Sequence, residues 1–328
     1  MASPGQSTLF NTFTELVSTT YRNHSKEIAD NVSNHNALYR RIADKGRAST
    51  EDGGLSIVRP LDYANNSTYQ RYSGYDTLNI SASDVITAAE FPWRQVAINV
   101  VASGLELRTN SGDSRIINLV KARIKNAMRS AANGMSTDLY SDGTATNQIN
   151  GLQALISDTG TGTVGGINSS TYSFWQNIVQ SAAAPLQGGS AITPSSTTIE
   201  SLMLPTWIKA TRGNDMPDLI VMSDDYFTYY EQSQTSLKRY TAEESGKGGM
   251  VSMKYKTADV FFDSSGGIPT SHAYFINTDF LEMVAHTDAN FTMMDELRSV
   301  NQDAIVIPIL WQGNMICSNR ARQAVMKA

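Results

Sequence analysis

The chain has 328 residues, of which 41% are hydrophobic, enough to bury a sizeable core and to form two compact lobes. Its formal net charge is −5 and only 17% of its residues are charged, a balance without the basic stripe typical of nucleic-acid-binding proteins. No apolar run reaches the roughly 18 residues of a membrane span, and the single cysteine, Cys317, excludes an internal disulfide.

The first patterned stretch, residues 9–42, places apolar side chains at steps of three and four, as in an amphipathic helix. The apolar stripe is thin, so we expect one or two helices that form an arm and lie on another surface. The end of this arm is basic, with Arg40, Arg41, Lys45 and Arg47. Two interpretations stay open for these cations: a solvated helix end, which is the common case, or contact with an anionic partner.

Residues 50–81 differ in character and are punctuated by turn pairs such as Gly53-Gly54. The runs 55–61 and 68–72 are β-prone and predict a two-stranded ribbon. Such a ribbon has too little apolar side chain for a core of its own, so another surface must hold it. Tyrosines suit that contact because each combines an apolar ring with a polar tip; the alternative is a loose insertion with ordinary surface tyrosines. The spaced tyrosines are Tyr63, Tyr69, Tyr72 and Tyr75.

The stretch 84–107 has alternating apolar residues that predict strand, with Pro92 marking an edge or a bulge. Residues 113–140 predict one long helix, with Asp113 as its N-cap and Gly143 just past its end. At 1.5 Å per residue this helix would be roughly 40 Å long, and we interpret it as a spine for strands from elsewhere. Its apolar stripe comprises Ile116, Val120, Ile124, Ala127, Met128, Ala131, Met135 and Leu139.

The rest of the chain alternates helix and strand signals and predicts a second, α/β region followed by returning strands. A short apolar run at 152–156 and a Gly/Thr/Ser-rich loop at 157–170 precede it. We expect helices at 171–186, 195–212 and 226–240, and strands at 218–222, 256–263, 273–277, 281–286, 304–312 and 315–325.

We find no motif for catalysis, for a cofactor or for a metal. None of the four histidines has a cysteine or carboxylate at metal-ligand spacing, and no Gly-x-Ser-x-Gly or phosphate-binding loop occurs. Asp138, Asp142 and Thr144 resemble part of a calcium loop but lack the closing glutamate. Cys317 lies among apolar residues in an expected strand, which is typical of an inert thiol. We therefore expect a protein that is not an enzyme and that carries no cofactor.

The order of these pieces resembles the major capsid proteins of tailed bacteriophages, which have the Hong Kong 97-type fold. The resemblance lies in VITAAEFPWRQVAINVVASGLELRTNSGDSRIINLVKARIKNAMRSAANGMSTDLYSDG and, in the same order as in that family, in NQINGLQALI, PDLIVMSDDYF, AYFINTDFLEM and ILWQGNMICSNRARQAV. It implies an α+β fold with an N-terminal arm (1–48), an extended β-hairpin loop (49–83), a peripheral domain with the spine helix (84–150 and 278–315), and an axial domain (151–277 and 316–328).

The resemblance also implies a function. The chain would form hexamers and pentamers of an icosahedral head around double-stranded DNA, as part of a virion assembled in the bacterial host cytoplasm. Its partners would be portal, scaffolding and decoration proteins, with the DNA contacted non-specifically and no membrane contacted. The sequence has no room for a fused N-terminal scaffolding domain, so we expect a separate scaffold; the alternative is a scaffolding segment removed before this numbering begins. We expect the contacts between subunits to include Arg40, Arg41, Arg59, Tyr63, Tyr69, Arg71 and Tyr72.

Two other functions stay open at this point. The first is another structural protein of the virion or its tail, which would share the same assembly logic. The second is a hydrolase-like α/β enzyme with an unfamiliar site, which the missing motifs disfavour. Some members of the capsid family link their subunits through a lysine of the extended loop. Here no lysine occurs between Lys45 and Lys121, so we expect a shell without such covalent links.

Overall fold

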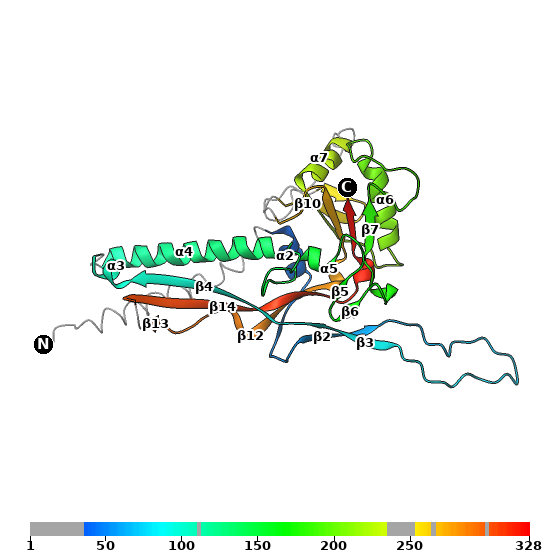
Figure 1. Cartoon of the computed structure of the whole chain (residues 1–328), viewed down its shortest axis with the longest axis horizontal. Helices are drawn as coiled ribbons and strands as arrows, with labels where there is room; N and C mark the ends of the chain where they lie inside the picture. The colour runs from blue at the N-terminus through cyan, green and yellow to red at the C-terminus, as the bar shows by residue number, and fades with distance from the viewer. Residues whose placement is uncertain (1–35, 110–112, 235–252, 264–266, 299–301) are drawn as a thin grey trace.

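The computed structural model describes residues 36–109, 113–234, 253–263, 267–298 and 302–328; the expected arm before residue 36 lies outside this range. Figure 1 shows an elongated molecule with a long helix and a sheet at one end, a second lobe beside them, and a two-stranded ribbon that projects past that lobe. The architecture is α+β, as the sequence predicts. None of the described helices is long and apolar enough to cross a membrane.

A five-stranded sheet forms the first lobe. Strand β14 pairs with β4 along one edge and with β12 and β13 along the other, and β12 also pairs with β1. The strands are β1 (Ala48–Glu51), β4 (Arg94–Ser103), β12 (Leu281–Met293), β13 (Leu297–Arg298) and β14 (Ala304–Cys317).

The spine helix α4 (Asp113–Asp138) covers one face of this sheet, as the apolar stripe predicts. Its 26 residues give a length of about 39 Å. Because strand side chains alternate between faces, Ile305, Ile307 and Ile309 of β14 all point at the helix. They pack against Ile124, which is only 1% exposed, together with Ala127 and Met128. Burying one such side chain stabilises the fold by about 1.5–3 kcal/mol.

A six-stranded mixed sheet forms the second lobe, in the order β7-β15-β11-β8-β10-β9. Two helices pack against one face through a cluster that includes Trp207 and Phe275. The other face, with Val221 and Tyr274, joins a cluster that continues into the first lobe, so one core connects both. The elements are β7 (Ile178–Ser181), α6 (Ile199–Ala210), β8 (Leu219–Met222), α7 (Asp224–Ser233), β9 (Met253–Tyr255), β10 (Ala258–Phe262), β11 (His272–Ile276) and β15 (Ala324–Lys327).

Several short elements complete the fold. The helices are α2 (Ala37–Asp44), α3 (Gly104–Thr109) and α5 (Leu152–Leu155), and the 3-10 turns are η1 (Ser173–Trp175), η2 (Thr278–Phe280) and η3 (Arg320–Arg322). Helix α3 joins β4 to α4 at the end of the molecule farthest from the second lobe. A small hairpin consists of β5 (Thr163–Val164) and β6 (Ile167–Asn168).

The projecting ribbon consists of β2 (Ile57–Asp62), β3 (Ile86–Phe91) and the loop 63–85 between them. The expectation of a strand at 68–72 is wrong, because β2 pairs with β3 instead. The strand stretch expected at 84–107 is interrupted at Pro92, where the chain leaves the ribbon before it enters the five-stranded sheet at Arg94. The strand expectation is wrong for residues 104–107, because β4 ends at Ser103 and α3 begins at Gly104.

The helix expected at 171–186 is also wrong. Phe174, Trp175, Ile178 and Val179 fit helical spacing, but Ile178 begins strand β7, which pairs in parallel with β15. The Trp175 indole donates to the Val164 carbonyl at 2.9 Å, which holds the preceding turn in place. Tertiary pairing here overrides the local pattern.

Two further boundaries differ from expectation. The strand expected at 315–325 is broken by η3, so β14 and β15 belong to different sheets. Helix α7 ends at Ser233, and residues 235–240 of the helix expected there lie outside the described residues.

Candidate assembly surfaces

Metal ligands and the single cysteine are the first candidates for chemistry in this chain. Among the described residues, no group of three or more His, Cys, Asp or Glu is placed to hold a metal ion. Cys317 is fully buried in β14, and burial raises the pKa of its thiol to about 12, so the reactive thiolate is scarce. The surfaces that call for a function are those that face away from the core.

The loop of the ribbon is one such surface. Tyr69 is 84% exposed, Tyr72 66% and Tyr75 fully exposed, and Arg71 is exposed beside them. Leu78 and Ile80 on the returning limb are exposed as well. Among the described residues, the hydrogen bonds of this loop, such as the one from the Gln70 side chain to the Thr77 carbonyl at 3.1 Å, stay within the loop. A group of large apolar side chains held away from the core marks an interaction surface.

The base of the ribbon is fixed by ion pairs. Arg59 of β2 donates to Glu51 of β1 at 2.6 Å and to Glu282 of β12 at 3.0 Å. Ser49 of β1 donates to the same Glu282 at 2.5 Å. All three charged side chains are mostly buried, which screens them less than surface pairs. The ribbon is therefore tied at its root to the edge of the five-stranded sheet.

A second support comes from the β5–β6 hairpin. The Glu90 amide donates to the Gly165 carbonyl at 3.0 Å. Gly165 has φ +58°, and a Cβ there would lie 2.9 Å from the Ala89 Cβ, so only glycine allows the hairpin to approach β3 this closely. Tyr63, at the end of β2, stacks on Phe174 with ring centroids 5.3 Å apart.

Arg320 supports this hairpin from behind. Its guanidinium is fully buried and donates to the carbonyls of Leu155 at 2.6 Å and Trp175 at 3.0 Å, and to the Asn177 side chain at 2.8 Å. Burial lowers the pKa of Arg320, because its partners are neutral oxygens. Trp175 in turn donates to Val164, so hydrogen bonds connect the interior to the root of the ribbon.

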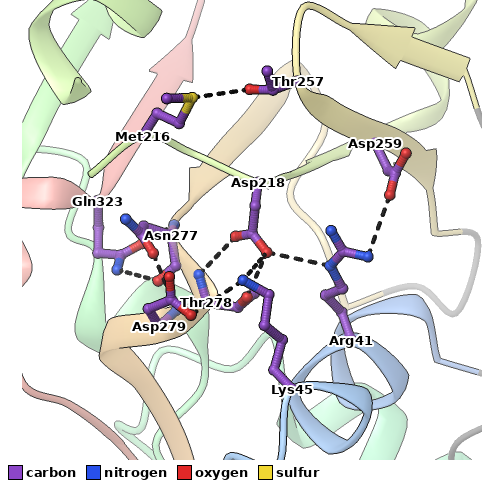
Figure 2. A network of polar contacts seen from close by, with 10 residues as sticks. All are labelled: Arg41, Lys45, Met216, Asp218, Thr257, Asp259, Asn277, Thr278, Asp279 and Gln323. Carbon is purple, nitrogen blue, oxygen red and sulfur yellow. Dashed lines mark hydrogen bonds and ion pairs between the residues drawn. The ribbon is translucent and has the colours of Figure 1, made fainter. Parts of the chain in front are cut away.

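Helix α2 is attached to the second lobe by the ion-pair network in Figure 2. Arg41 lies 3.2 Å from the Asp218 carboxylate and 3.4 Å from that of Asp259. Lys45, one turn later, lies 3.3 Å from Asp218 and 3.1 Å from Asp279. Asp218, just before β8, is thus shared by two cations.

The carboxylate of Asp218 is held in its charged form. Burial alone would raise its pKa, but hydrogen bonds from the Thr278 hydroxyl at 2.6 Å and amide at 2.8 Å, with the charges of Lys45 and Arg41, lower it overall. For Lys45, burial acts to lower the pKa, and the bonds to Asp279 and Asp218 outweigh that effect and raise it. Both shifts favour the ionised pair.

The seven residues expected at subunit contacts fall into two groups. Arg41, Arg59 and Tyr63 have partners within the chain, and Arg40 lies 3.9 Å from Asp44 on its own helix. Tyr69, Arg71 and Tyr72 lie together on the exposed loop. Sequence reasoning missed Asp218 and Glu282, the partners of Arg41 and Arg59. These lie 177 and 223 residues away, and no local pattern connects such distant positions.

The sequence matches no protein-family model and no curated protein. Solved structures do match along most of the chain. A cyanophage A-1(L) capsid asymmetric unit has a TM-score of 0.61 and 16% identity, covering 86% of this chain and 90% of that one. The chain has a Hong Kong 97-type capsid fold. The capsid of an empty GTA particle has a TM-score of 0.55 at 12% identity, covering 86% of this chain and 88% of that one. The capsid of Myoviridae phage XM1 has a TM-score of 0.51 at 9% identity, covering 87% and 90%.

This capsid fold confirms the resemblance inferred from the order of the sequence motifs. At identities of 9–16% the likeness shows the fold alone, so the surfaces of this chain must be interpreted from its own residues.

Proposed function

We propose that this chain is a major capsid protein, a structural subunit that assembles into hexamers and pentamers of an icosahedral phage head around double-stranded DNA. The observation that carries the proposal is the ribbon: its root is fixed by Arg59 and Gly165, while its loop presents Tyr69, Tyr72 and Tyr75 to solvent. A rigid root and an apolar, unsupported loop suit a contact with a neighbouring copy.

Exposure of the aromatic side chains of the ribbon to water is unfavourable in free energy. A ribbon with this much exposed aromatic surface gains little from its own fold, but burying it against a neighbour removes apolar area from water at about 25 cal/mol per Å². Each subunit of a shell repeats such contacts with several neighbours. Interfaces that are modest alone add up when they act together, which is how a shell is stable without a single tight contact.

The fold's usual division applies to this chain in the proposal. The arm is 1–48, the extended loop 49–83 continues into β3, the peripheral domain holds α4 (84–150 and 278–315), and the axial domain is 151–277 with 316–328. Arg40, Arg41, Arg59 and Tyr63 have partners within the chain, which supports a role for them at the roots of the arm and the ribbon. Tyr69, Arg71 and Tyr72 then make the direct contacts to neighbours.

The chain is a component of the virion and assembles in the bacterial host cytoplasm. Its partners are a portal protein and a separate scaffolding protein, and a decoration protein is a further candidate. Nothing in this function needs a catalytic residue or a cofactor.

The shell is held without covalent links. The ribbon contains no lysine to act as a nucleophile, and Cys317 is buried with a raised pKa. Boiled and reduced particles should give one band near 35.8 kDa on a denaturing gel. A ladder of covalent oligomers would contradict the proposal on this point.

The ribbon itself provides the test of function. The Tyr63 amide donates to the Val85 carbonyl at 3.0 Å, so residues 64–84 can be replaced by a two-residue Asn-Gly turn that keeps β2 and β3 paired. We expect this variant to fold with the melting temperature of the wild type but to sediment as a monomer. The wild type should sediment as capsomers or shells under the same conditions. If the shortened variant forms shells as the wild type does, the ribbon is not the assembly element.

A further inference from the structure

The spine helix carries an unusual charge distribution. Residues 114–137 contain five cations and no aspartate or glutamate. This run has a net charge of +5 in a chain of net charge −5, which leaves −10 for all other residues. The cations are Arg115, Lys121, Arg123, Lys125 and Arg129. The total charge of the chain therefore conceals one basic element.

Among the described residues, the side chains of α4 that pack into the core lie on one face of the helix. Ile124, Ala127, Met128 and Ala131 are buried on the side of the sheet. The opposite side is exposed over the described side chains and carries small polar residues together with the cations; no described element covers it in Figure 1. The exposed residues are Ala122, Lys125, Asn126, Arg129, Ser130, Asn133, Gly134 and Thr137.

The cations of α4 differ in whether they form an ion pair within the chain. Arg123 turns toward the sheet, where it pairs with Glu106 and donates to the Val101 carbonyl. Lys125 and Arg129 are exposed, and among the described residues no ion pair involves either of them. They lie four residues apart, one turn of helix, so both project from the same side about 6 Å apart along the axis. Lys121 precedes Lys125 by the same interval in the sequence.

We infer that the solvent-exposed face of α4, opposite the sheet, is a contact surface for the phosphate backbone of duplex DNA. This contact does not depend on the DNA sequence. The inference rests on the proposed function, since a shell of this chain encloses such DNA. Uncompensated cations at one-turn spacing, interleaved with Asn and Ser donors, match what phosphates accept. A few contacts per subunit give weak binding that the acidic remainder of the chain opposes. Weak contacts of this kind on the inner wall of the shell would not hold back the DNA as it enters.

The test compares two double variants with equal loss of charge. Lys125→Gln with Arg129→Gln removes the exposed cations of α4. Lys209→Gln with Lys254→Gln removes two exposed lysines from the second lobe, on α6 and β9. Binding of the full chain to a fluorescent duplex of about 30 base pairs is measured by anisotropy from about 50 to 200 mM salt, a range over which phosphate contacts lose most of their strength.

We expect the wild type and the second-lobe variant to bind alike. The α4 variant should bind about tenfold or more weakly at low salt, and the slope of log K against log salt should fall by about two, one for each phosphate contact removed. All three proteins should melt at the same temperature, because the substituted side chains are exposed. No duplex binding by the wild type, or equal affinities and slopes in both variants, would overturn the inference.

Electron microscopy of the same preparations separates this inference from the proposed function. If all three proteins form shells and the α4 variant binds DNA like the wild type, the inference fails and the capsid function stands. If the wild type forms no shells in any condition that supports assembly, the proposed function fails, whatever the DNA binding shows.

Discussion

The spine helix and the ribbon are both extended features of the molecule, and they are stabilised in opposite ways. Helix α4 buries Ile124 to 1% exposure against strands of its own chain. The loop of the ribbon leaves Tyr75 fully exposed, and only its root is fixed. This difference distinguishes the parts of the chain that stabilise the folded subunit from the parts that are available to contact a neighbouring copy. Substitutions on the buried face of α4 should change folding, whereas substitutions in the loop should change assembly alone.

The largest expected effect is that of Ile124→Asp. A carboxylate at this position would be buried between α4 and β14 without a partner, which costs several kcal/mol and exceeds much of the stability of a typical domain. We expect insoluble or unfolded protein. Asn126→Asp, on the exposed side of the same helix, is the matched control and should melt normally in a thermal scan. Normal melting of Ile124→Asp would show that this face of α4 is not buried.

Arg320→Ala tests the support behind the ribbon and should be next in size. It leaves the carbonyls of Leu155 and Trp175 and the Asn177 side chain without their buried donor, at a cost of about 2–4 kcal/mol. Arg322→Ala is the control, because Arg322 is only partly buried and makes one long hydrogen bond of 3.4 Å to the Ala210 carbonyl. Chemical denaturation should separate the two variants clearly. Equal stabilities would mean that the Arg320 contacts contribute little.

These two positions also show how far sequence reasoning reaches. The helical period predicts α4 and the burial of Ile124, because a long amphipathic stripe is a local signal. Arg320 looks like any cation near the C-terminus, since its partners lie 143 to 165 residues away. The pairing of β2 with β3 across 23 loop residues was missed because the two strands are distant in the sequence. Strand β7 lies where a helix was expected at 171–186, because its partner β15 is also distant in the sequence. The basic face of α4 was missed as well, because the net charge of the whole chain does not show where the charged residues lie.

The pH dependence of stability should be smaller. His272 Nδ1 lies 2.8 Å from the Thr270 carbonyl and Nε2 lies 3.0 Å from Asp158, so both ring nitrogens face acceptors, and both hydrogen bonds form only when both nitrogens carry protons. Lys327 opposes the added charge, and Tyr274 stacks on the ring. Burial alone would lower the pKa of His272, but the bonds to Asp158 and Thr270 raise it above its ordinary 6.5.

The sign follows from this raised pKa. The stabilising contribution of His272 is fully present below pH 6.5 and is lost as the pH rises through the higher value in the folded state. We expect a loss of up to about 1 kcal/mol between about pH 6 and pH 9, since the pair is partly exposed. His272→Gln should remove this loss and His286→Gln should keep it, as measured by denaturation at each pH. A loss that survives His272→Gln would assign the effect to another group.

The smallest effect on stability should come from the ribbon loop. Replacing Tyr69, Tyr72 and Tyr75 together with serine removes no buried contact, so the free energy of unfolding should change by less than about 0.5 kcal/mol. Assembly should be lost, because the apolar surface offered to neighbours is removed. Replacing Tyr172 with serine, a half-exposed tyrosine outside the ribbon, should leave assembly intact. Assembly of the triple variant at wild-type concentrations would place the contact elsewhere.

The central claim is that this subunit completes itself by contact with copies of itself, and negative-stain electron microscopy of the purified wild-type chain tests it most directly. The account predicts closed shells or rings of hexamers and pentamers, alone or with a co-expressed scaffold. Discrete small particles at every concentration, or open tubes in place of shells, would contradict it.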